Sequence, residues 1–99
     1  SLTTLARPYA KAAFELALAQ QALAAWDDML GLASSIAMDE SMAKLLDSPL
    51  ISSAQVSGII SDAAGDAFDS QFNGYISVLA DNDRLPLLPQ ITELYRELR

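Results

Sequence analysis

The stretch that decides the fold is TLARPYAKAAFELALA, residues 4–19, in which apolar residues fill most of a helical wheel. Arg7, Lys11 and Glu15 are four residues apart and fall together on one narrow polar arc. A surface helix usually needs an apolar stripe little wider than 100° to bury its core face. We therefore expect this helix to be either the central helix of its own fold or a helix shared with a partner.

The bulky side chains of this helix divide into two apolar stripes. The first stripe consists of Leu5, Tyr9, Ala12 and Leu16. The second consists of Phe14 and Leu18, with Ala10 and Ala17 beside them. If one stripe packs in the core of the chain, the other is left as a surface on which a partner helix could dock.

The whole composition agrees with a helical chain. Alanine and leucine account for 17 and 16 of the 99 residues, and glycine and proline for four each. Alanine and leucine lose little conformational freedom in a helix. A chain of this length holds one hydrophobic core, so we expect a single all-α domain over residues 1–99.

Several classes of function are disfavoured by the residues that are missing. The chain has no cysteine and no histidine, which removes the thiolate nucleophile and the commonest general base and zinc ligand. Its formal net charge of −7 has the wrong sign for a nucleic-acid backbone or an anionic membrane surface. No uncharged stretch, including residues 16–26, is long enough to cross a bilayer. We therefore expect no catalytic residues, no metal, no cofactor, no nucleic acid and no direct membrane insertion.

Five further helices follow from capping residues and apolar periodicity. A second helix is expected over residues 22–37, after a break at Gln20 and Gln21 that periodicity alone does not establish. Asp39, Ser52 and Asp69 suit N-caps of the third, fourth and fifth helices, with Ser52 and Gln55 forming a capping box. The first helix is expected to carry Pro8 in its opening turn, and the sixth to open with Pro86. The prediction is a compact six-helix bundle.

The fifth helix offers a second candidate surface. Phe72, Tyr75 and Leu79 lie on its core side, whereas Gly74 and Val78 lie on a neighbouring edge. Glycine within a helix costs about 1 kcal/mol relative to alanine, and one reason to tolerate it is the close approach of another backbone. This edge and the first stripe of the opening helix could together form an apolar groove for an amphipathic helix.

Two other patterns give alternative functions. The acidic pairs Asp27-Asp28 and Asp81-Asn82-Asp83 could hold a metal or act as acid and base, but acids at solvated helix ends need no such role. The segment Asp47-Ser48-Pro49-Leu50 is a poor match to the attachment site of acyl carrier proteins, because Pro49 replaces the leucine expected there. A carrier domain using Ser48 and a generic helix-binding adaptor stay open as alternatives.

Three segments resemble the delta subunit of bacterial F-type ATP synthases, the counterpart of the mitochondrial oligomycin-sensitivity-conferring protein. The run LARPYAKAAFE, residues 5–15, resembles the first helix of that family and is the most specific of the three. WDDML, residues 26–30, fits its second helix, and NDRL with LP at residues 82–85 and 88–89 fits the entry to its sixth. The three segments occur in the family's order and cover essentially the whole chain.

The resemblance implies a non-catalytic stator component. It implies an N-terminal six-helix domain that binds the N-terminal helix of an ATP synthase alpha subunit. A C-terminal domain, absent from these 99 residues, would hold the peripheral stalk b subunits. It also implies a peripheral location at the cytoplasmic face of the bacterial inner membrane. Helices one and five form the contact in this family, which gives as predicted partner-binding residues Leu5, Tyr9, Ala12, Leu16, Gly74, Tyr75 and Val78.

Overall fold

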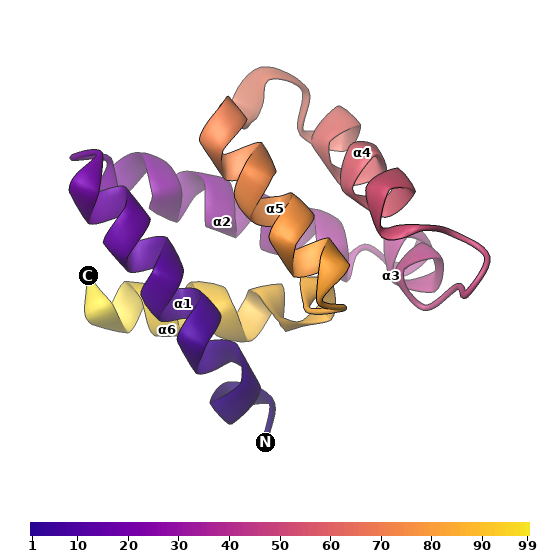
Figure 1. Cartoon of the computed structure of the whole chain (residues 1–99), viewed down its shortest axis with the longest axis horizontal. Helices are drawn as coiled ribbons and strands as arrows, with labels where there is room; N and C mark the ends of the chain where they lie inside the picture. The colour runs from indigo at the N-terminus through magenta and orange to yellow at the C-terminus, as the bar shows by residue number, and fades with distance from the viewer.

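The computed structural model describes residues 1–99 and contains six α-helices, two short 3-10 turns and no strand (Figure 1). The α-helices are α1 (Leu2–Ala19), α2 (Leu23–Met38), α3 (Glu40–Leu46), α4 (Ser53–Ala64), α5 (Ser70–Asp81) and α6 (Leu88–Leu98). The 3-10 turns are η1 (Gly65–Ala67), which precedes α5, and η2 (Leu85–Leu87), which precedes α6. The all-α, six-helix prediction is confirmed.

The predicted caps form as expected. Asp39 and Asp69 each accept a hydrogen bond from the backbone N–H three residues later, at the starts of α3 and α5. Ser52 and Gln55 form the reciprocal capping box, in which the Gln55 side chain accepts from the Ser52 N–H at 2.9 Å. The break between α1 and α2 is also confirmed, because Gln21 adopts a left-handed conformation with φ 55° that ends the helix.

Two expectations about proline are wrong. The helix α1 begins at Leu2, capped by the Ser1 hydroxyl, so Pro8 lies inside the helix and not in its opening turn. Because Pro8 has no N–H, the carbonyl of Thr4 loses its helical donor. Pro86 lies in η2, and α6 opens two residues later at Leu88 with Pro89 in its first turn.

The helices pack in two groups around one core. In Figure 1, α6 passes behind α1 and runs alongside α2, packing against both, while α4 and α5 form a pair on the other side of α2. Trp26 of α2 is fully buried where the groups meet and contacts the rings of Phe72 and Tyr75 edge to face. Trp26 therefore belongs to the hydrophobic core and joins the two groups of helices.

The core face of α1 is a row of alanines, and neither of its bulky stripes is central. Ala6, Ala10, Ala13 and Ala17 are buried, which brings α1 close to its neighbours. Leu18 of the second stripe is 54% exposed, so this stripe is not buried as a whole in the core of the chain. A row of small residues allows close helix packing, and the larger side chains are displaced to the flanks of the helix.

Hydrogen bonds and an ion pair tie α6 to α2. The Tyr95 hydroxyl donates to the Leu23 carbonyl at 2.6 Å. Asp27 accepts from Arg96 and Arg99, each at 2.9 Å, so it is not the solvated acid that the sequence suggested. Partial burial acts to raise the pKa of Asp27, but the hydrogen bonds and positive charges of the two arginines outweigh it and lower that pKa.

Candidate functional site

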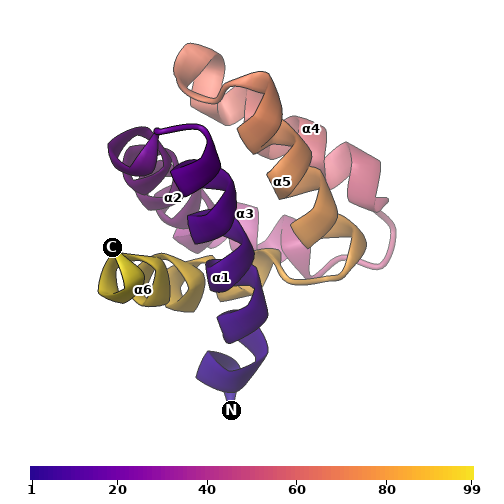
Figure 2. The ribbon, with the colours of Figure 1, turned by 60° about the vertical axis from the view of Figure 1, so that its left-hand side comes forward.

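An apolar groove of about 560 Å³ runs between α1 and α5. These helices lie side by side and run in opposite directions (Figure 2), but their backbones make few close approaches. Side chains of both helices line the groove: Pro8, Tyr9, Ala12, Leu16, Gly74, Tyr75 and Val78. Six of the seven predicted partner-binding residues are therefore brought together by the fold.

The α1 wall is the first apolar stripe of the sequence. Ala12 is exposed, Leu16 is 43% exposed, and Tyr9 is half-buried against the core. Leu5 continues the stripe at 46% exposure but does not line the groove itself. Most of the surface of this stripe is therefore exposed in the folded chain and is available to another molecule.

The α5 wall is low because Gly74 has no side chain. A Cβ built at Gly74 would meet no atom of the chain within 4 Å, so packing inside this molecule does not require the glycine. Val78, one turn further along α5, is 50% exposed. A backbone could therefore lie directly over Gly74 and contact Val78 with its side chains.

Tyr75 forms the floor of the groove and joins its two walls. Only 6% of its surface is exposed, and its hydroxyl donates to the Tyr9 carbonyl at 2.7 Å. Burial, and to a smaller extent the neighbouring Tyr9, raises the pKa of Tyr75 far above its ordinary value, so the hydroxyl stays protonated as a donor. This bond spans α5 and α1 and fixes their separation at the middle of the groove.

Sequence reasoning missed Pro8 as a lining residue. Its pattern was interpreted only as a helix-start signal, whereas the structure places it one helical position before Tyr9 at the edge of the groove. The signal that could have revealed it was its place on the wheel beside the first apolar stripe.

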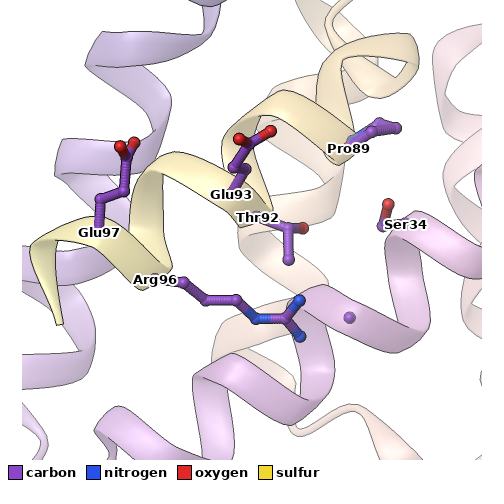
Figure 3. A pocket seen from close by; sticks show the side chains of 7 residues that line it. Ser34, Pro89, Thr92, Glu93, Arg96 and Glu97 are labelled. Carbon is purple, nitrogen blue, oxygen red and sulfur yellow. The ribbon is translucent and has the colours of Figure 1, made fainter.

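A second hollow, of about 620 Å³, lies between α2 and α6 (Figure 3). The Arg96 and Thr92 side chains point toward α2, whereas Glu93 and Glu97 point away from it. Its lining is polar or small, and the Thr92 hydroxyl already donates to the Leu30 carbonyl. This hollow offers no apolar anchor comparable with those of the α1–α5 groove.

The structure assembles none of the other sites that the sequence brought into question. No group of three acidic side chains is placed to hold a metal ion. None of the helices combines the length and apolar character that crossing a membrane requires. The Ser48 hydroxyl is engaged inside its own turn, where it accepts from the Leu50 N–H at 3.3 Å.

Comparisons with known proteins agree on one family. The model of the family described as ATP synthase delta (OSCP) subunit matches residues 5–99. The ATP synthase subunit delta of Idiomarina loihiensis is 45% identical over 98 residues, which cover 99% of this chain and 55% of the relative. That of Alcanivorax borkumensis is 45% identical over 97 residues, covering 98% and 54%. The chain thus spans about half the length of these curated relatives.

Proposed function

The chain belongs to the ATP synthase delta (OSCP) subunit family, and on that premise we propose that its α1–α5 groove binds the N-terminal helix of an ATP synthase alpha subunit. The observation that carries the proposal is the joining of two exposed apolar helix edges into one groove, with Tyr75 as its floor. Amphipathic helices dock in such grooves through apolar anchors at i, i+3, i+4 and i+7.

The role of the domain is mechanical. Rotation of the central shaft exerts torque on the catalytic head, and a stator must resist that torque through a link that dissociates slowly. Buried aromatic and aliphatic contacts govern dissociation more than exposed charge pairs do. The side chains of Tyr9, Leu16 and Val78 supply such contacts without any chemical step.

The remaining partners and the location follow from the same proposal. These 99 residues would form the N-terminal six-helix domain of a delta subunit. The part of the protein outside them would hold the peripheral stalk b subunits. The assembled protein would lie peripherally at the cytoplasmic face of the bacterial inner membrane. The carrier interpretation at Ser48 gains no support from the family or from the local hydrogen bonding.

Calorimetric titration of the domain with an alpha-subunit N-terminal peptide tests the proposal. Ala12→Asp places a charge on an exposed position inside the groove, and Tyr9→Ala removes an aromatic anchor. We expect each substitution to weaken binding at least about tenfold, because Ala12→Asp buries an unpaired charge under the docked helix and Tyr9→Ala removes apolar contact. The Tyr9 backbone carbonyl survives the second change, so its bond from Tyr75 is retained.

The matched control is Ala24→Asp, which adds the same charge to an exposed position of α2 away from the groove. We expect it to leave affinity unchanged, and circular dichroism should show that every variant stays folded. Equal affinity of wild type, Ala12→Asp and Tyr9→Ala would remove this groove from the binding site. No binding of the peptide to the wild type would overturn the assigned partner.

A further inference from the structure

The net negative charge of the chain comes from one part of the fold. Residues 39–83, which form α3, α4, η1 and α5 with their connections, carry eight acidic residues and one lysine, a formal charge of −7. The remaining residues, which include α1, α2 and α6, carry five acids and five bases and are neutral as a group. The groove lies where these two parts meet, since α1 forms one wall and α5 the other.

The helix α5, which forms one wall of the groove, has acidic residues at both of its ends. Asp66 and Asp69 precede the helix, Asp81 is its last residue and Asp83 follows it, with no charged residue at 70–80. Because α5 has 12 residues, these two acidic pairs are about 18 Å apart along its axis. The wall between them is the uncharged surface of Gly74 and Val78.

None of these four carboxylates is neutralised within the chain. All four residues are exposed, and the only ion pairs join Asp27 to Arg96 and Arg99 on the far side of α2. Asp69 caps α5 and Asp81 accepts from the Ser53 hydroxyl, but neither contact supplies a positive charge. The negative charge at the two ends of α5 is therefore not cancelled by any ion pair within the chain.

We propose that the groove selects a basic amphipathic helix, with Lys or Arg near both ends of its apolar stripe on the side facing α5. This inference rests on the proposed function and specifies the chemistry of its partner. Charges at the rim of an interface raise the association rate and its sensitivity to salt more than they change contacts in the centre. The apolar wall holds the helix, and the acidic ends of α5 attract and orient it.

The test compares two variants of the full 99-residue chain that carry the same change in net charge. The first, D66N/D69N/D81N/D83N, removes the charges at the ends of α5. Asparagine preserves the cap at position 69, the acceptor at position 81 and the left-handed backbone at Asp83, where φ is 57°. The second, D39N/E40Q/D47N/D62N, removes four exposed charges elsewhere in the acidic part of the chain.

Three synthetic probes are measured by stopped-flow Trp26 fluorescence and calorimetry, at about 25 and about 300 mM salt. One is the alpha-subunit N-terminal peptide. The other two are designed amphipathic helices with the same apolar stripe, carrying either lysines or glutamates at both ends. For wild type at low salt, we expect the lysine helix to associate at least about tenfold faster than the glutamate helix. The first variant should lose most of that preference, and the second should keep most of it.

The outcomes separate this inference from the proposed function. If the alpha peptide fails to bind but the lysine helix is preferred, the assigned partner is wrong and the charge selection stands. If the alpha peptide binds and the lysine and glutamate helices associate equally fast, the charge selection is wrong. Equal losses in the two variants would show that net charge alone acts, which would also overturn it. So would sedimentation showing that the peptide-free chain pairs with a second copy through the groove.

Discussion

Some residues of the groove pack in the core of the chain, whereas others are exposed and can contact a partner. Tyr75 serves both, because its ring packs against Trp26 while its hydroxyl joins α5 to α1. Ala12 and Val78 are exposed and contribute little to the core of the chain. Gly74 is the clearest case, since nothing inside the molecule excludes a side chain at that position.

Substituting Gly74 should therefore change stability and binding in opposite directions. Gly74→Ala should raise the free energy of unfolding by up to about 1 kcal/mol, because alanine is the better helix former and its Cβ meets no clash. The same methyl group should weaken binding of the alpha-subunit peptide several-fold by separating the two backbones. Urea unfolding and calorimetric titration measure the two effects.

Gly58→Ala is the matched control, because Gly58 also lies in a helix with open space around its Cβ position but is outside the groove. It should stabilise the chain to a similar extent and leave binding unchanged. A Gly74→Ala variant that binds as tightly as wild type would show that no backbone lies over this glycine.

At the scale of the element, α1 combines a core row of alanines with two flanks of larger side chains. The alanine row brings α1 close to α6, and the flank containing Tyr9 and Leu16 becomes a wall of the groove. Pro8 interrupts the hydrogen bonding of this same helix beside that wall. The helix α1 thus lacks one backbone hydrogen bond at the position where it meets the proposed partner.

Pro8→Ala should stabilise the chain by restoring this hydrogen bond. The new N–H at position 8 can donate to the Thr4 carbonyl, so we expect the free energy of unfolding to rise by about 1 to 3 kcal/mol. Pro89→Ala serves as the comparison, because Pro89 lies in the first turn of α6, where an N–H has no helical acceptor. Chemical denaturation of both variants decides the matter, and a Pro8→Ala chain no more stable than wild type would contradict it.

At the scale of the whole molecule, two helix groups share one core but differ in charge. The pair formed by α4 and α5 belongs to the acidic part of the chain, whereas α1, α2 and α6 are neutral as a group. Within the neutral group, Asp27 of α2 forms ion pairs with Arg96 and Arg99 at the end of α6. These ion pairs join residues that are about seventy positions apart in the chain.

Lowering the pH should weaken the ion pairs that join α2 to α6. Because the arginines lower the pKa of folded Asp27, its ionised form favours folding at neutral pH, and this contribution is lost as pH falls below about 4 through the folded pKa. Asp27→Asn should lower the free energy of unfolding by about 1 kcal/mol at pH 7 and by much less near pH 2. Thermal unfolding across this pH range measures the difference.

Asp28→Asn is the control for this prediction, since Asp28 is exposed and makes no ion pair. Its stability should follow that of wild type at both pH values. If Asp27→Asn and Asp28→Asn behaved alike throughout, the ion pair would contribute nothing to stability.

The sequence by itself determined the helices, because their signals are local. Caps such as Asp39, Ser52 and Asp69 depend on a backbone N–H only three residues away. The two apolar edges of the groove were also visible, since wheel positions follow from spacing alone. The prediction was wrong at Pro8 and Pro86, because the Ser1 cap starts α1 before Pro8 and a 3-10 turn containing Pro86 precedes α6.

Only the tertiary structure decided how those edges meet. Periodicity could not show that the alanine row is the fully buried face of α1, with Tyr9 and Phe14 only partly buried beside it. That choice depends on how closely α6 approaches α1. Nor could it place the Tyr75 hydroxyl on the Tyr9 carbonyl, a contact between residues 66 positions apart. The groove is formed by two helices that are distant in the sequence, and the packing of the entire chain sets the distance between them.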